Sequence, residues 1–341
     1  MSAQDLAKVL TLRPTNAVAR LGAASRLPLL DPRDLLRALA SSPGALPSIP
    51  VVSRAALPGL LRAARTEDAV LGLVCQHPLA ERNAPERFIE ALRWATAVAP
   101  HERPVYLEAG PVRVSREEEA ALRDGLFRVV DAGFTLVSLD LTRLPVEDAV
   151  RAVAAIVGPV LERELSLEVS LPSLEGAPEH EAARALLEGL AGARVPVRFL
   201  RAAGQGDEPD VEGLRALVEC AAAFGASLSL EEPHAASFRS LPSCVAAGVR
   251  KLAAPAPFGR VVLNAYPEEE RLGIAERAMA AGVPAGELLA MLEERLPALA
   301  PAARERVEAL SFAEAVELFS RVGASRTGRR AMAFLAQGAG S

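Results

Sequence analysis

The strongest constraint on the fold is a regular alternation of short apolar runs with longer stretches of helical period, beginning near Ile49. Eight runs rich in Val and Leu have the length and composition of buried β-strands. We predict these strands at residues 49–53, 69–75, 103–109, 134–140, 164–170, 195–201, 226–231 and 249–253. Amphipathic patterns predict helices at residues 85–98, 115–131, 145–161, 178–190 and 211–224.

Strands that alternate with helices along a chain form parallel sheets, and eight such units close into an α/β (β/α)8 TIM barrel. The 341 residues are enough for one barrel with additions. We assign residues 1–48 to an N-terminal helical extension with helices at 3–12 and 32–40, and residues 49–253 to the barrel. Residues 254–341 are expected to complete or cover the barrel with helices at 268–281, 285–296, 301–309 and 312–322, followed by a Gly-rich tail.

Composition excludes several classes of protein. The chain is 50% hydrophobic with a net charge of −5, and no Lys/Arg cluster with interleaved aromatic residues predicts nucleic-acid binding. Cys75, Cys220 and Cys244 are too scattered for a disulfide framework or a metal knuckle. No apolar run reaches roughly 18 residues and no signal pattern opens the chain. We therefore expect a cytoplasmic protein with no membrane partner.

Acidic side chains occur near the ends of several predicted strands. If those ends converge, Glu108, Asp140, Glu168 and Glu231 or Glu232 form an acidic site with His234 beside it. Clustered carboxylates raise one another's pKa values and suit either acid–base chemistry or a hard cation such as Mg²⁺ or Mn²⁺. The alternative is that Asp140 and Glu168 are structural groups paired with arginines such as Arg143 and Arg201.

Lys251 is the only lysine of the barrel segment, so any Schiff-base chemistry there would have to use it. Its neighbour Arg250 favours a solvated or salt-bridged strand end instead. The other histidines, His77, His101 and His180, are dispersed along the chain and do not form a recognisable zinc site.

Two segments resemble class II fructose- and tagatose-bisphosphate aldolases without an internal gap. Asp140-Leu-Thr-Arg-Leu-Pro-Val-Glu-Asp resembles the family's Asp-Ala-Ser-His-Leu-Pro-Phe-Glu-Glu. Leu165-Ser-Leu-Glu-Val-Ser-Leu-Pro-Ser-Leu-Glu-Gly resembles its Val-Ser-Val-Glu-Ala-Glu-Leu-Gly-Thr-Leu-Gly-Gly. Weaker matches are Tyr106-Leu-Glu-Ala-Gly, Leu228-Ser-Leu-Glu-Glu-Pro-His and Gly248-Val-Arg-Lys-Leu. The resemblance covers roughly residues 69–330 and extends to the non-catalytic subunit of tagatose-bisphosphate aldolase.

The resemblance implies a zinc ion, held by three histidines, that polarises the substrate carbonyl. The matching positions here are Ala109, Gly204 or Gln205, and Glu231, so none of the family's zinc histidines is present and zinc is not expected. Asp140 is the one retained metal-site position, because Ser170 stands where the family has glutamate.

Two further positions bear on catalysis. Glu108 matches the family's catalytic aspartate. The family's phosphate-binding glycines become Glu232-Pro-His-Ala, which brings a carboxylate and a proline without an N–H.

Three hypotheses follow. The preferred one is a non-catalytic or regulatory aldolase-like subunit in carbohydrate metabolism, which forms a homo-oligomer or joins a catalytic aldolase-like partner. The second is a repurposed aldehyde-lyase, in which Glu108 is the acid–base group and Asp140, Glu168 and Glu231 surround a divalent cation or a small carbonyl or sugar ligand. The third is a Schiff-base enzyme built on Lys251, and Lys251 and His234 are also candidate substrate-binding residues.

Overall fold

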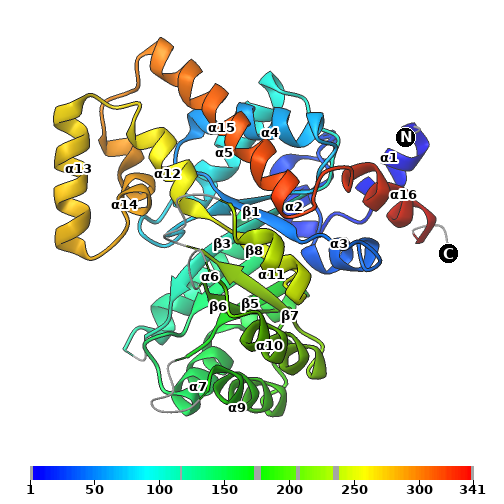
Figure 1. Ribbon diagram of the computed structural model, residues 1–341. Helices are drawn as coiled ribbons and strands as arrows, with labels where there is room; N and C mark the ends of the chain where they lie inside the picture. The colour runs from blue at the N-terminus through cyan, green and yellow to red at the C-terminus, as the bar shows by residue number, and fades with distance from the viewer. Residues whose placement is uncertain (1–2, 116, 173–177, 205–207, 233–237, 339–341) are drawn as a thin grey trace.

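The centre of the molecule is a closed barrel of eight parallel strands (Figure 1). The computed structural model describes residues 3–115, 117–172, 178–204, 208–232 and 238–338. Each strand pairs with the next one in sequence, and the first pairs with the last, which closes the barrel. The strands are β1 (Leu46–Pro50), β2 (Leu71–Cys75), β3 (Val105–Arg113), β4 (Leu136–Asp140), β5 (Ser166–Ser170), β6 (Phe199–Ala203), β7 (Ser227–Glu231) and β8 (Lys251–Ala253). The predicted (β/α)8 fold is confirmed.

Helices surround the barrel and extend it at both ends of the chain (Figure 1). Those between strands are α4 (Leu57–Thr66), α5 (Ala84–Val98), α6 (Glu119–Ala132), α7 (Val146–Ile156), α8 (Gly158–Glu162), α9 (Glu179–Gly192), α10 (Val211–Ala223) and α11 (Leu241–Ala247), with the 3-10 turn η1 (Arg54–Ala56) before α4. The N-terminal extension forms α1 (Ala3–Leu10), α2 (Thr15–Leu21) and α3 (Pro32–Ala38). The C-terminal part forms α12 (Pro255–Leu263), α13 (Glu268–Ala281), α14 (Ala285–Leu292), η2 (Glu293–Arg295), α15 (Pro301–Arg321) and α16 (Gly328–Gly338).

The first strand begins at Leu46, earlier than the Ile49 that its apolar pattern predicts. Pro47 and Pro50 argue against a central strand in the sequence, because proline cannot donate to a ladder. In the structure the donors come from residues beside the prolines. Leu46 N donates to the carbonyl of Arg250, and Val51 N donates to the carbonyl of Val74.

Two predictions for the C-terminal part are wrong. Residues 301–321 form one helix, α15, rather than two. The expected break falls at Leu310 and Ser311, and neither of these residues is a helix breaker such as proline or glycine. The segment expected to be a Gly-rich tail forms helix α16 over Gly328–Gly338, and its Met332 and Leu335 are buried. Tertiary packing against α1 overrides the weak helix propensity of its glycines.

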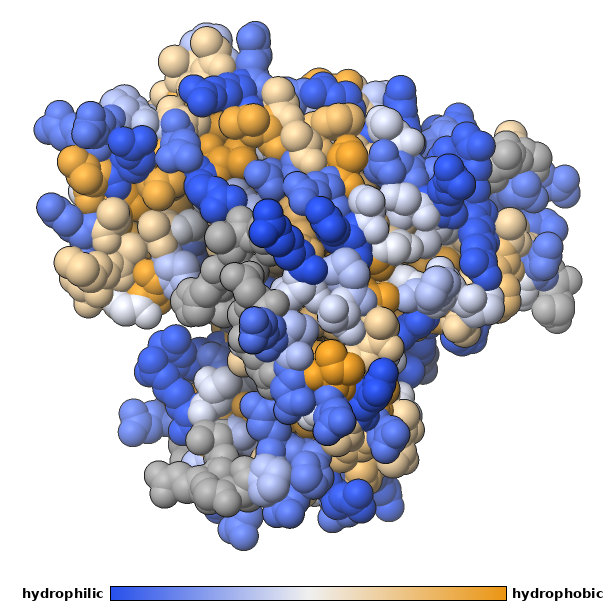
Figure 2. All heavy atoms as spheres, viewed as in Figure 1, coloured by the Kyte–Doolittle hydropathy of each residue, from blue (hydrophilic) through white to orange (hydrophobic). Residues whose placement is uncertain are grey.

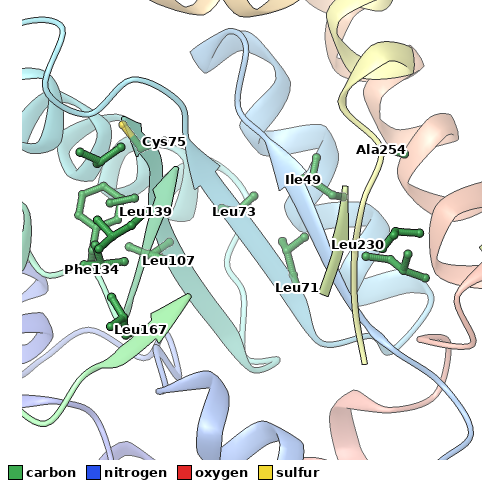
Figure 3. Packing of buried hydrophobic residues seen from close by; sticks show 14 of the residues in the cluster. Ile49, Leu71, Leu73, Cys75, Leu107, Phe134, Leu139, Leu167, Leu230 and Ala254 are labelled. Atoms are coloured by element: carbon green, nitrogen blue, oxygen red, sulfur yellow. The ribbon is translucent and has the colours of Figure 1, made fainter. Parts of the chain in front are cut away.

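Side chains of the strands alternate between two apolar clusters. Outward residues such as Leu73, Leu107 and Leu230 belong to the larger cluster, which lies between the strands and the surrounding helices (Figure 3). Inward residues near the strand starts belong to a second cluster with residues of α1, α3 and α16. These inward residues are Leu46, Tyr106, Leu136 and Phe199. The N-terminal end of the barrel is therefore closed by apolar packing.

The N-terminal extension is attached to the barrel by backbone and side-chain hydrogen bonds. Leu29 forms a parallel bridge with Val105 at the start of β3. Asp31 caps α3 and also accepts a 2.6 Å hydrogen bond from Ser166 Oγ of β5. Burial raises the pKa of Asp31, and the hydrogen bonds from Ser166 and Arg33 oppose that rise.

The C-terminal helices leave some apolar surface uncovered. Apolar side chains lie among charged ones over these helices (Figure 2), and Leu272 and Met279 of α13 are exposed. Among the described residues, no helix is both long and apolar enough to cross a membrane.

Gly72 provides a test of the apolar layer. A Cβ at this position would overlap the ring of Tyr106, whose hydroxyl donates a 2.9 Å hydrogen bond to the carbonyl of Pro47. We expect Gly72→Ala to lower the free energy of unfolding by about 1–3 kcal/mol in urea denaturation, because the barrel interior is overpacked. Gly192→Ala is the control, since no atom lies within 4 Å of its Cβ and no loss of stability is expected. Equal losses in the two variants would contradict this account.

Candidate functional site

Lys251 lies in the barrel interior between two glutamates on other strands. Its Nζ is 2.9 Å from Glu108 Oε1, 2.8 Å from Glu108 Oε2 and 2.8 Å from Glu168 Oε2. The side chains of Lys251, Glu108 and Glu168 are 2%, 4% and 0% exposed, so water contributes little to their solvation. The expected salt bridge of Lys251 is present, but a solvated strand end is not.

Two serines complete the hydrogen bonding of the glutamates. Ser48 Oγ donates to Glu108 Oε2 at 2.6 Å, and Ser138 Oγ donates to Glu168 Oε1 at 2.8 Å. The ring of Phe199 lies below the ammonium, with its centroid 5.8 Å from Lys251 Nζ. We call these five polar residues, Lys251, Glu108, Glu168, Ser48 and Ser138, the lysine cluster.

The two serines are functional-site residues that the sequence reasoning missed. Ser48 fell outside the predicted first strand, and Ser138 lies within an otherwise apolar one. Strict alternation of side chains would have found Ser138. It faces inward with Glu168, its directly paired residue on β5.

The electrostatics of the lysine cluster favour a charged lysine. Burial would lower the pKa of Lys251, but Glu108 and Glu168 outweigh it and raise that pKa above its ordinary value. Burial raises the pKa of Glu108, and the attraction of Lys251 only partly opposes this. Burial acts the same way on Glu168, but Lys251 and Arg201 hold its pKa below the ordinary value. A lysine held as an ammonium ion is not a nucleophile.

The other two acidic candidates lie nearer the C-terminal ends of the strands, and each has a cation beside it. Arg201 of β6 is buried, and its Nη1 is 2.8 Å from Glu231 Oε2. Arg113 Nε is 3.9 Å from Asp140 Oδ2, so the nearest arginine of Asp140 is Arg113 rather than the predicted Arg143.

Asp140 is also held by its own loop. Thr142 donates to Asp140 Oδ1 from its backbone N–H at 3.0 Å and from its hydroxyl at 2.6 Å. Burial would raise the pKa of Asp140, but these hydrogen bonds, together with Arg201 and Arg113, lower it below the ordinary value. Asp140 is therefore a stable carboxylate rather than an acid at neutral pH.

The described residues around the lysine cluster enclose a small cavity. The cavity lined by Glu108, Glu168, Arg201, Glu231 and Lys251 has a volume of about 20 Å³. That volume suffices for about one water molecule, whereas ligand sites measure roughly 300–1,000 Å³. The structure thus brings Glu108 and Glu168 together around Lys251, and the cavity between these described residues is smaller than a substrate.

The described residues do not fit the zinc ion that the family resemblance implies. Ala109 is fully buried in the apolar cluster on the opposite side of β3 from Glu108, and Glu231 is paired with Arg201. Ser170 Oγ accepts a 2.7 Å hydrogen bond from the backbone N–H of Leu141. Within the described part of the chain, no three His, Cys, Asp or Glu side chains are grouped to hold a metal ion. Gln205 and His234 lie outside the described residues.

Comparison with known proteins supports the fold. No family model matches this chain, and neither does any curated protein. The YdjI aldolase from Escherichia coli K12 superposes with a TM-score of 0.63 and 13% identity, over 87% of this chain and 98% of that one. A candidate fructose-1,6-biphosphate aldolase from Coccidioides immitis superposes with a TM-score of 0.58 and 17% identity, over 91% and 97% of the two chains. At these identities the likeness shows that the chain has the barrel fold of aldolases.

Removal of the ammonium tests the lysine cluster. We expect Lys251→Met to lower the free energy of unfolding at pH 8 by about 3–5 kcal/mol, because two buried carboxylates lose their cation. Without Lys251, burial raises the folded-state pKa of both glutamates above the unfolded-state value. The stability of the variant is then greatest below the unfolded-state pKa of the glutamates, and it falls as the pH rises toward their folded-state pKa. The loss of stability relative to the parent protein should therefore be smaller at pH 5 than at pH 8.

The control is Lys8→Met, which removes the chain's other lysine from an exposed position on α1. Its effect should stay within about 0.5 kcal/mol at both pH values. Urea denaturation of the three proteins at pH 5 and pH 8 measures both quantities. A Lys251→Met variant as stable as the parent, or a loss independent of pH, would refute the assigned role of Lys251.

Proposed function

We propose that this chain is a non-catalytic aldolase-like barrel protein that serves as a regulatory or accessory subunit in carbohydrate metabolism. The observation that carries the proposal is the position of the Lys251 ammonium, within 2.9 Å of three carboxylate oxygens of Glu108 and Glu168. The ammonium neutralises Glu108 and Glu168, two of the catalytic candidates from the sequence analysis. The remaining space has the volume of about one water molecule.

An acid–base group must reach a proton of the substrate. Glu108 is 3% exposed and its oxygens are directed to Ser48 and Lys251. To act on a substrate, it would have to break a buried ion pair, which leaves a buried charge without its partner. This cost supports a structural role for Glu108 rather than a catalytic one.

The end of β7 is also unfavourable for a phosphate group. Glu232, which is 1% exposed, stands where the family has glycine, and it directly follows Glu231, which stands where the family has a zinc histidine. A Cβ on Gly204 would overlap the carboxyl group of Glu232, which shows how closely that side chain packs on the neighbouring loop. Carboxylates at this position repel an anionic substrate. Sugar bisphosphates are therefore not expected as ligands of the barrel.

The fold similarity to aldolases suggests which partners to consider. We propose either a second copy of this chain or a catalytic aldolase-like subunit, whose activity or stability this protein would modify. Co-expression with a candidate catalytic aldolase, followed by size-exclusion chromatography and turnover measurement, distinguishes the two partners.

The direct test measures metal content and aldol cleavage. We expect protein purified in the presence of zinc to contain much less than one zinc ion per chain and to show no retro-aldol turnover on fructose or tagatose bisphosphate. The physical reason is that Ala109 offers no ligand and Glu231 is paired with Arg201. A competent class II aldolase, assayed in parallel, is the positive control. Zinc near one per chain together with turnover would refute the proposal.

Measurements with Mg²⁺ and Mn²⁺ distinguish the proposal from a lyase that uses the carboxylates for catalysis. Here Mg²⁺ and Mn²⁺ should leave the melting temperature unchanged, because Glu108, Asp140, Glu168 and Glu231 each already have a cation beside them. Cation-dependent turnover that disappears in Glu108→Gln would instead establish a lyase.

Borohydride trapping tests the chemistry of Lys251 itself. We expect no covalent adduct at Lys251 after incubation with a triose phosphate or pyruvate and sodium borohydride at pH 7.5, because the amine stays protonated between two carboxylates. Peptide mass spectrometry reads out the modified residue. The exposed Lys8 reports on nonspecific modification, and selective labelling of Lys251 over Lys8 would show that the amine is free to react.

A further inference from the structure

A much larger pocket lies beside the barrel rather than in its centre. It has a volume of about 670 Å³ and is bounded by the ends of β1 and β2, by α5 and by the segment from α14 to α15. A pocket of this size is within the range that binds small molecules. The lysine cluster does not explain it, because only Gln76 lines both this pocket and the small cavity.

The walls of the pocket are fixed by polar contacts between the C-terminal helices and the loops after β1 and β2. Three such contacts are Ser53 Oγ to Glu293 Oε1 at 2.6 Å, His77 Nε2 to Glu287 Oε1 at 2.6 Å, and Arg295 Nη2 to Glu81 Oε1 at 2.9 Å. Because they join segments far apart in sequence, the pocket is formed before any ligand arrives. A preformed site spends less binding free energy on ordering its own side chains.

The inner wall is apolar except for one amide. Leu57, Phe88 and Tyr266 line this wall and are buried. The Oε1 atom of Gln76 is also buried, and it accepts no hydrogen bond in the described part of the structure. Because this oxygen has almost no accessible surface, a ligand in the pocket would contact the apolar wall and not this atom.

The rim carries an aromatic ring and a cation. Trp94, the only tryptophan of the chain, is 53% exposed there. Arg304 also lines the pocket, and its guanidinium has no ion-pair partner among the described residues. Arg87, by contrast, is neutralised by Glu81 at 2.6 Å.

A second positive feature lies next to Arg304. Helix α15 begins at Pro301, and its N-cap residue Ala300 provides no side-chain cap, so N–H groups of its first turn are left without side-chain partners. The residues just before this end, Pro297 and Leu299, line the pocket. Glu90 of α5 also lines the pocket and has no ion-pair partner in the described structure, so the positive features lie on the α15 side of the pocket.

We propose that this pocket binds a small organic anion with an aromatic body. The aromatic body packs against Phe88 and Trp94, and the anionic group pairs with Arg304 at the start of α15. The site is independent of the proposed role of the barrel interior, since it uses no residue of the lysine cluster.

The test uses 8-anilinonaphthalene-1-sulfonate, which has an aromatic body and a sulfonate. Titration into the full-length protein should give saturable one-to-one binding, with enhanced dye emission and quenching of Trp94, the only tryptophan. Naphthalene-1-sulfonate should displace the dye at about tenfold lower concentration than the uncharged 1-naphthalenemethanol, because only the anion pairs with Arg304.

Variants of two pocket residues and one matched control show whether the dye binds in this pocket. Arg304→Glu should weaken dye binding about tenfold, and Ala91→Phe, which fills the pocket from α5, should abolish it. Arg306→Glu, an exposed arginine on the same helix that does not line the pocket, should leave binding unchanged. Circular dichroism confirms that each variant is folded. Absence of saturable binding, or equal binding by the Arg304 and Arg306 variants, would overturn the proposal.

Discussion

The ion pairs of Lys251 are the interaction on which the barrel interior depends. Three strands, β3, β5 and β8, each contribute a charged group that would be strongly unfavourable alone in this buried position. The ammonium and the carboxylates offset one another's loss of hydration only when all three side chains are in place. The hydroxyls of Ser48 and Ser138 satisfy the remaining carboxylate oxygens. The described residues of the interior therefore form a specific polar core.

Much of the fold could be predicted from the sequence, because the alternation of strands and helices is a local pattern. The pairing around Lys251 could not, since its nitrogen bonds to a residue 143 positions away. The neighbouring Arg250 also gives no guide to the environment of Lys251. Successive residues of a strand point to opposite faces, and Arg250 donates outward to the carbonyls of Ser42 and Leu39 while Lys251 points inward.

The difference between local patterns and distant contacts also explains which site residues could be predicted from the sequence. Glu108 and Glu168 are recognisable because a charged residue is rare in an apolar strand, whereas the partner that decides their role lies on β8. The large pocket could not be predicted at all. Its walls come from η1, α5 and the α14–α15 segment, and contacts such as that of Ser53 with Glu293 join residues 240 positions apart.

An ammonium ion and a metal ion can both neutralise clustered carboxylates, but they differ in what they leave available. A catalytic metal keeps a coordination position open for water or substrate. A lysine ammonium has three N–H donors, and three carboxylate oxygens lie within 2.9 Å of Lys251 Nζ. It therefore preserves the packing and charge balance of the barrel interior. In the described part of the structure, a ligand-sized space lies elsewhere, between the strand ends and the C-terminal helices.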